Sequence, residues 1–159
     1  MPCYLFTYHG HGTWMPDRTR GYVKRKAGIQ PQNLEMAANY RRNQQQPTVE
    51  FDLTLQSILI DGIRAACEMI EVRCHCIATD RSHLHILASW KTDRKLLSVS
   101  RAIKSSLSRR LNKRFGHRQW FSKGSSHKQV RDMAHFNHLI EVYLPNHRGA
   151  SFTEKTCES

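Results

Sequence analysis

The chain has no run of apolar residues long enough to span a bilayer, and its opening residues are too polar for a secretory signal. It also lacks the cysteine pattern of a disulfide-stabilised secreted domain, because its five cysteines are odd in number and spread along the chain. No internal repeat or second domain is visible. We therefore expect a cytoplasmic protein without a membrane partner, with reduced thiols, folded as a single domain over residues 1–159.

Acidic residues are almost missing from one quarter of the chain. Between Lys91 and Arg131 there are thirteen lysines and arginines and a single acid, Asp93, whereas the rest of the chain carries twelve charges of each sign. A charge needed only for solubility would be scattered, so this basic stripe (residues 91–131) indicates contact with phosphates, with a solvated helix face as the alternative. The expected phosphate-binding residues are Lys104, Arg109, Arg110, Lys113, Arg114, Lys123, Lys128 and Arg131.

Hydrophobic periodicity predicts an alternation of strands and helices. Apolar steps of three and four residues predict helices at 55–70 and 93–115, and a last helix is expected at 132–144. The strand signals lie at 4–14, 72–79 and 83–90, with a further hairpin at 119–130. This order favours an α+β, ferredoxin-like sandwich, with an antiparallel sheet, helices on one face and a C-terminal helix.

Two segments fall outside this pattern. Residues 17–50 are polar and basic, and we expect an excursion with little core of its own and a short helix near 34–40. Residues 150–159 are expected to form a flexible tail.

Two histidines flank a leucine in the predicted strand 83–90. Because strand side chains alternate, His83 and His85 emerge on one face while Leu84 and Ile86 enter the core. Two neutral imidazoles one strand step apart can share a metal ion. The chain has ten histidines, so such a triplet also arises by chance, and two surface histidines are the alternative.

A tyrosine and a histidine stand four residues apart in the predicted last helix. Tyr143 and His147 would lie on one side of it, so that His147 could supply a third metal ligand while Tyr143 points its phenol at the same ion. The alternative is an amphipathic helix end with a partly buried tyrosine. Pro145 is expected to disfavour helical geometry at Leu144.

A competing metal site involves two cysteines. Cys74 and Cys76 alternate onto one strand face and, with His83 and His85, could form a Cys2His2 zinc site that stabilises a structural module. The spacing matches no zinc finger, and small buried cysteines are commoner. The remaining histidines have no spacing partner and are expected at the surface or near phosphates: His9, His11, His117, His127, His135 and His138.

Together these motifs resemble the single-tyrosine HUH transposases, and within them the REP-associated tyrosine transposases. His83, Leu84 and His85 match the HUH triplet, and Tyr143 and His147 stand where the family has its nucleophile and a third ligand. The segment HGTWMPDRTRG (residues 11–21) is also similar to the family's early segment. His147 departs from the Gln or Asn of relatives, and Leu139 stands where some relatives have a tyrosine.

The resemblance implies a metal-dependent enzyme that nicks single-stranded DNA and transfers strands through a 5′-phosphotyrosine. Tyr143 would be the catalytic residue, on a C-terminal catalytic helix, and the three histidines would bind a divalent ion, Mg²⁺ or Mn²⁺. A nitrogen ligand at His147 would shift the preference towards Mn²⁺ or Zn²⁺.

The DNA implied by the resemblance is a single strand with a hairpin, held by the basic stripe, and a homodimer is compatible with it. A domesticated, non-catalytic nucleic-acid-binding protein of the same fold is the alternative. Four aromatic residues would either stack on unpaired bases or pack in the core: Trp14, Tyr22, Trp120 and Phe121.

Overall fold

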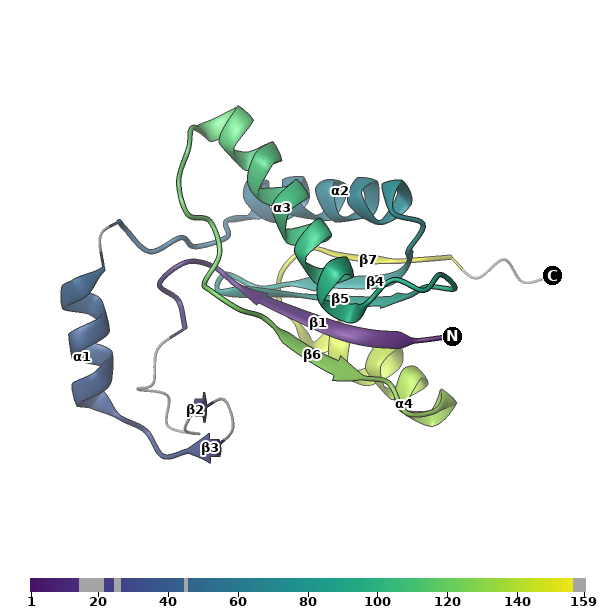
Figure 1. The fold of residues 1–159 in the computed structure, drawn as a ribbon, viewed down its shortest axis with the longest axis horizontal. Helices are drawn as coiled ribbons and strands as arrows, with labels where there is room; N and C mark the ends of the chain where they lie inside the picture. The colour runs from purple at the N-terminus through teal and green to yellow at the C-terminus, as the bar shows by residue number, and fades with distance from the viewer. Residues whose placement is uncertain (15–21, 25–26, 45, 156–159) are drawn as a thin grey trace.

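The sheet at the centre of the molecule has five antiparallel strands in the order β6-β1-β5-β4-β7 (Figure 1). The computed structural model describes residues 1–14, 22–24, 27–44 and 46–155. The strands of this sheet are β1 (Cys3–His9), β4 (Arg73–Thr79), β5 (His83–Ser89), β6 (Ser126–Gln129) and β7 (Ser151–Thr153).

The predicted ferredoxin-like topology is confirmed. Along the chain the elements run β1, α2 (Leu53–Met69), β4, β5, α3 (Leu96–Phe115) and β6, and the last strand of this series lies beside the first. This is the split βαβ arrangement, in which both crossover helices pack on the same face of the sheet. Figure 1 shows α2 and α3 side by side on that face.

The main core lies between this face and the two helices. Leu59 and Ile63 from α2 meet Ile103 and Leu107 from α3 above the strands, and all four are buried. The helices approach closely at Gly62, where an added Cβ would lie 2.8 Å from the Leu107 side chain. Asp52 caps α2 by accepting a hydrogen bond from the Leu55 amide at 2.7 Å.

The C-terminal helix covers the opposite face of the sheet (Figure 1). It starts as α4 (Met133–His138), widens into a π-helical turn (Leu139–Tyr143) and tightens into a 3₁₀ turn (Leu144–Asn146). Leu139 and Leu144 pack there against Leu5 and Leu87. The expected loss of helical geometry at Leu144 is wrong, since its φ is −68° and its ψ is −39°. The chain starts a new turn at Leu144, and Pro145 falls within the first residues of that turn, where proline is tolerated.

Two further predictions on strands are corrected. Residues 119–130 do not form a hairpin: only β6 is a strand, it pairs with β1, and Trp120 and Phe121 before it are buried in the main core. Residues 150–159 are not a flexible tail throughout, because β7 pairs with β4 and forms one edge of the sheet. Residues 156–159 lie outside the described part.

The polar excursion forms small elements of its own. β2 (Tyr22–Lys24) pairs with β3 (Gly28–Gln30), and α1 (Leu34–Asn43) follows, which confirms the short helix. In Figure 1 these elements lie away from the sheet, and Ala37 is the buried residue of α1. Across the described ranges, no helix is both long and apolar enough to cross a membrane.

Candidate metal centre and nucleophile

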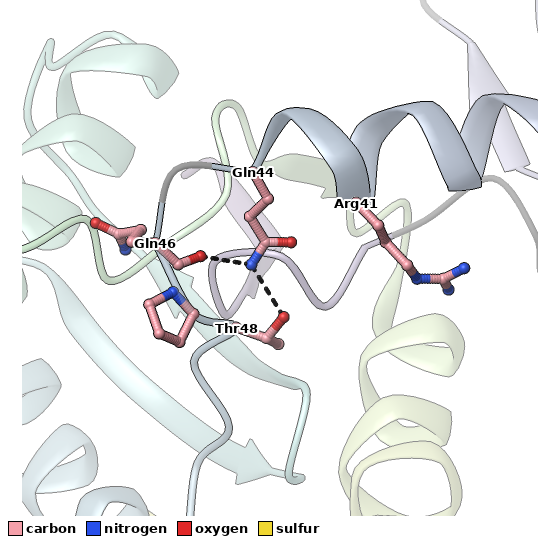
Figure 2. Close-up of a pocket in the computed structure, with 5 residues that line it drawn as sticks. Arg41, Gln44, Gln46 and Thr48 are labelled. Carbon is pink, nitrogen blue, oxygen red and sulfur yellow. Dashed lines mark hydrogen bonds between the residues drawn. The ribbon is translucent and has the colours of Figure 1, made fainter.

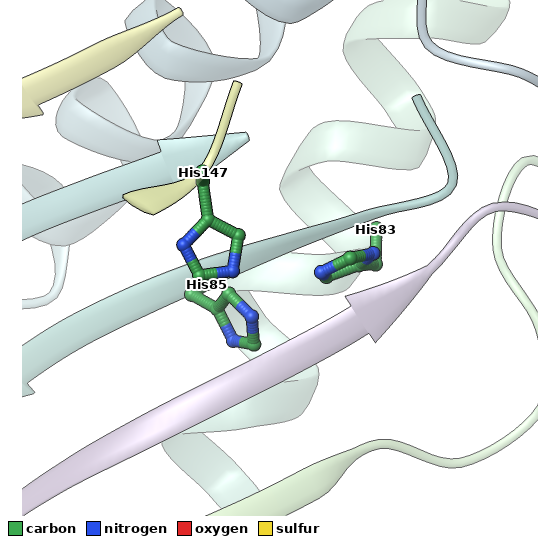
Figure 3. A group of neighbouring side chains, drawn as sticks. All are labelled: His83, His85 and His147. Carbon is green, nitrogen blue, oxygen red and sulfur yellow. The ribbon is translucent and has the colours of Figure 1, made fainter. Parts of the chain in front are cut away.

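Three imidazoles converge on the sheet face that the C-terminal helix covers (Figure 3). His83 and His85 come from β5, and His147 follows the 3₁₀ turn. One nitrogen of each ring lies within 4.8 Å of the other two, which confirms the predicted convergence. Two bonds of about 2.1 Å to one ion span at most about 4.2 Å, so small rotations of the rings would bring all three into bonding distance.

The Nδ1 atoms of all three rings have hydrogen-bond partners. Nδ1 of His85 lies 2.8 Å from the Thr7 hydroxyl, Nδ1 of His83 lies 2.9 Å from the Ser82 hydroxyl, and Nδ1 of His147 lies 3.1 Å from the Leu144 carbonyl oxygen. A carbonyl only accepts, so in His147 the proton sits on Nδ1 and the Nε2 lone pair is available. Such partners orient imidazole ligands in metal sites.

His85 is the most buried of the three, at 4% exposure. Burial, with the nearby rings of His83, His147 and His9, lowers its pKa from 6.5 to about 3, so the ring is neutral at physiological pH. Its Nε2 atom is buried without a hydrogen-bond partner. A buried polar atom left in this state is costly, and a metal ion would satisfy it, so these residues fit a divalent ion.

Tyr143 lies beside the cluster. Its ring centroid is 5.5 Å from that of His85 and 5.3 Å from that of His147. The side chain remains 40% exposed, so a bulky substrate can reach the phenol. Leu139, one turn earlier, is 3% exposed and packs in the core below the sheet, which leaves Tyr143 as the tyrosine of this helix that meets the histidines.

His147 is positioned by a close approach of the chain to the sheet. Gly149 donates its amide to the Thr79 carbonyl at 3.0 Å, and a Cβ at this position would overlap that oxygen. The next amide, of Ala150, donates to the buried side chain of Gln56 on α2 at 2.9 Å. The segment that carries His147 is therefore fixed to β4 and α2 directly after the ligand.

Two residues near the cluster were missed by the sequence analysis. Strand register places Thr7 opposite His85 and His9 opposite His83, and the His9 and His83 ring centroids lie 5.6 Å apart. Both come from β1, more than seventy positions earlier in the chain. The alternation of β1 predicts that Thr7 and His9 share a face, but only the pairing of β1 with β5 shows which face.

The cysteine alternative is wrong. A register shift between Cys74 and Cys76 marks a β-bulge at His75, so the two thiols do not share a face. Cys74 packs against the core under α2 and α3, while Cys76 packs on the side of the C-terminal helix. Among the described residues, the metal-ligating types gather only at His83, His85 and His147.

The basic stripe divides between several surfaces. Lys104, Arg109 and Lys123 line a groove beside α3, together with Arg101 and Arg118, which were not among the predicted contacts. Arg110, Lys113 and Arg114 are exposed elsewhere on α3, and Lys128 and Arg131 lie on or just after β6. Lys104, which was predicted to bind phosphate, already has partners within the protein, because its Nζ donates to the carbonyls of Ser122 and Gly124 at 2.7 and 2.6 Å.

The four aromatic residues that were predicted either to stack on bases or to pack in the core do not all behave alike. Trp120 and Phe121 are 6% and 4% exposed, so they pack in the core and offer no face to a base. Trp14 is partly buried. The side chain of Tyr22 lies outside the described part of the chain, as do residues 15–21 of the HGTWMPDRTRG segment.

A separate hollow lies after α1 and has no reactive groups of its own (Figure 2). It is lined by Arg41, Gln44, Gln46, Pro47 and Thr48. The side-chain amide of Gln44 donates to the Gln46 carbonyl at 2.7 Å and to the Thr48 hydroxyl at 3.1 Å. Both of these donors of Gln44 are therefore already bonded within the protein. We assign it no function.

Comparison with solved structures gives the same fold. The chain is similar to a REP-associated tyrosine transposase bound to a REP hairpin, with a TM-score of 0.52 and 12% identity over 86% of this chain and 61% of that one. It is also similar to a protein from Deinococcus radiodurans R1 described as a transposase, with a TM-score of 0.54 and 11% identity over 94% of both chains. The chain thus spans 61% of the length of the hairpin-bound structure.

Comparison of sequences gives the family. A search of curated proteins returns no match. The family described as IS200-like transposase matches residues 33–130, which is more than half of the chain and includes His83 and His85 but ends before Tyr143. On this match, and with the fold and the histidine cluster in agreement, the chain belongs to the IS200-like transposase family.

Proposed function

We propose that the protein nicks single-stranded DNA and transfers strands in a metal-dependent reaction, with Tyr143 as the nucleophile. The observation that carries the proposal is the convergence of an accessible phenol on three imidazoles, with ring centroids 5.3 and 5.5 Å from two of them. Membership of the transposase family supports the reaction class. The relative bound to a REP hairpin supports a single strand with a hairpin as the substrate.

The metal would be held by His83, His85 and His147, as Mg²⁺ or Mn²⁺, and the three nitrogen donors favour Mn²⁺ of the two. When bound, such an ion neutralises charge on the non-bridging oxygens of a phosphodiester. The Thr7 hydroxyl holds the ring of His85 in place, and the Leu144 carbonyl holds the ring of His147, each through the Nδ1 atom of the histidine.

Tyr143 would form the covalent intermediate. Its phenolic oxygen bonds to the scissile phosphorus, the bond from phosphorus to the 3′ oxygen breaks, and the electron pair of that bond leaves with the 3′ oxygen. The 3′ oxygen gains a proton and becomes a hydroxyl, while the phenol, 40% exposed, releases its own proton to water. The products are a 5′-phosphotyrosine and a free 3′-hydroxyl.

Strand transfer reverses these steps with another end. A second 3′-hydroxyl attacks the phosphotyrosine, the bond from phosphorus to the phenolic oxygen breaks, and Tyr143 regains its proton. The phosphotyrosine keeps the energy of the original phosphodiester, so no nucleotide cofactor is needed. The exposure of Tyr143 leaves room for either strand end to approach.

A single substitution tests the nucleophile. Tyr143→Phe should abolish a denaturant-resistant protein–DNA adduct because it removes only the attacking oxygen, and DNA affinity should stay within about twofold. The measurement is a denaturing gel after incubation with labelled single-stranded hairpin DNA and Mn²⁺. Tyr40 is also exposed but lies on α1, away from the histidines, so Tyr40→Phe is the matched control and should keep the adduct.

Two outcomes would contradict the proposal. An adduct that survives Tyr143→Phe would move the nucleophile to another residue. Tight binding by the unsubstituted protein with no adduct at any divalent ion tested would favour the non-catalytic DNA-binding alternative.

A further inference from the structure

The C-terminal helix contains one wide turn directly before the metal centre. This π-helical turn spans Leu139–Tyr143, and its i→i+5 hydrogen bond runs from the Leu144 amide to the Leu139 carbonyl. Single turns of this kind inside helices are rare and occur frequently at functional sites. Because the turn ends at Tyr143, its width sets the direction in which the phenol points.

In an uninterrupted α-helix, Tyr143 would point into the core. Side chains of an α-helix advance by about 100° per residue, so relative to Leu139 the side chain of Tyr143 would lie at about 40° and that of Leu144 at about 140°. Phe136 and Ile140, at about 60° and 100°, pack against the same apolar cluster as Leu139. Tyr143 would therefore lie inside the buried arc of the helix, and Leu144 would lie at the far edge of that arc.

The wide turn exchanges the places of these two side chains. A π-helical turn has more residues than an α-helical turn, so each residue advances by a smaller angle and residues five apart come closer together around the axis. Leu144 therefore moves in towards Leu139, and the two are 1% and 3% exposed. Tyr143 is turned back past Leu139, out of the buried arc, and remains 40% exposed. Its ring then meets the rings of His85 and His147.

Pro145 is the residue that a continuing α-helix could not accommodate. Its nitrogen carries no hydrogen, and in an α-helix its ring would clash with the carbonyl of Glu141, four positions earlier. In the structure Pro145 stands instead among the first residues of the separate 3₁₀ turn, where no amide donor is needed. The Pro145 side chain is exposed, so its ring acts on the backbone and not through packing in the core.

We propose that Pro145 is a positioning residue, which keeps the preceding helical turn wide and thereby directs the Tyr143 phenol out of the core towards His85 and His147. This deepens the proposed function and rests on it in one respect, that Tyr143 is the nucleophile. The direction of the phenol is a property of the free protein, and it can be measured without DNA and without metal.

The test replaces the proline and measures the accessibility of Tyr143. Pro145→Ala and Pro145→Ser both remove the ring and restore the amide hydrogen, so both allow the helix to continue in α geometry. Asn146→Ala, at the exposed neighbouring position of the same turn, is the matched control. Each metal-free protein is treated with N-acetylimidazole, which acetylates exposed tyrosine hydroxyls. Peptide mass spectrometry then gives the acetylation of Tyr143 relative to Tyr40, which is 47% exposed on α1.

Both proline variants should lower the acetylation of Tyr143 relative to Tyr40 by at least about threefold, because the phenol turns towards the core in α geometry. Asn146→Ala should keep this ratio. The rate of adduct formation on hairpin DNA with Mn²⁺ should fall about tenfold to a hundredfold in the proline variants, as for other misplaced reacting groups. DNA affinity should stay within about twofold, so that the loss lies in the chemical step and not in binding.

An acetylation ratio that is unchanged or raised in both proline variants would overturn the proposal, and so would an equal fall in Asn146→Ala. A fall cannot come from unfolding, because an unfolded chain exposes Tyr143 and raises the ratio. The adduct of the unsubstituted protein is measured in parallel. Its absence would refute the proposed chemistry, and the acetylation comparison would still decide whether Pro145 directs the phenol.

Discussion

At the scale of residues, the hydrogen-bond partner of each Nδ1 atom determines whether the Nε2 atom of that imidazole can bind a metal ion. The Thr7 hydroxyl, 2.8 Å from Nδ1 of His85, can accept a hydrogen bond from a protonated Nδ1, and in that tautomer the buried Nε2 keeps its lone pair. With burial holding the pKa of His85 at about 3, protons do not compete for this lone pair near neutral pH. Thr7 is therefore a positioning residue for the proposed metal site.

We expect Thr7→Val to weaken Mn²⁺ binding by about tenfold to a hundredfold, because a methyl group of similar size replaces the hydroxyl and leaves Nδ1 of His85 without a partner. Calorimetric titration of the DNA-free protein measures this. Thr7→Ser keeps the hydroxyl and should restore most of the affinity, which a purely structural role of the side chain would not explain. Equal affinity in Thr7→Val and the unsubstituted protein would contradict the assignment.

At the scale of elements, the C-terminal helix changes its pitch twice within fourteen residues, from α through π to 3₁₀. The wide turn ends at Tyr143 and the tight turn at Asn146, so the chain leaves the helix just before His147. Gly149 then brings it against Thr79 at the end of β4. The position of His147 thus depends on a helix, on a close backbone approach and on the side chain of Gln56.

Gly149→Ala should displace His147, since the new methyl group would overlap the Thr79 carbonyl oxygen and crowd the Gln56 side chain. We expect metal affinity to fall at least about tenfold and the free energy of unfolding to fall by about 1–3 kcal/mol, as for other strained core substitutions. Titration with Mn²⁺ and urea unfolding measure the two effects. Ser151→Ala, at an exposed position two residues later, should leave the metal affinity and the free energy of unfolding unchanged. A Gly149→Ala protein with normal metal affinity would show that the close approach of the chain to β4 does not position His147.

At the scale of the whole molecule, the proposed ion would join parts of the chain that are far apart in sequence. His83 and His85 belong to the centre of the sheet, and His147 belongs to the layer beneath it. The three histidines lie on the face of the sheet that the C-terminal helix covers, whereas the main core lies on the other face. Metal binding should therefore stabilise the protein without being needed for folding.

Mn²⁺ at about a hundred times its dissociation constant should raise the free energy of unfolding by about 2.7 kcal/mol and the melting temperature by about 5–10 °C. Thermal unfolding with and without the ion measures the shift, and His147→Ala should remove most of it. The protein treated with a chelator should still unfold cooperatively. If chelation alone abolished the folded state, the ion would have the structural role that belonged to the zinc-module alternative.

Local patterns in the sequence were sufficient to predict most of the helices and strands and to name the main candidate residues of the site. The apolar steps of α2 and α3 are determined by neighbours in the chain, and the structure confirms both helices. The pairing of β4 with β5 also follows from a short turn. The second hairpin failed because the apolar side chains of Trp120 and Phe121 find a place in the core, and this depends on α3 and not on their neighbours.

The sequence by itself determined the ferredoxin-like order of elements and the candidates His83, His85, Tyr143 and His147, because these follow from spacing over a few residues. Only the tertiary structure decided that Thr7 and His9 join them, that the bulge at His75 separates Cys74 from Cys76, and which cations of the basic stripe share a groove. Strand register, bulges and helix packing arise from contacts between residues distant in the chain, and no local pattern encodes them.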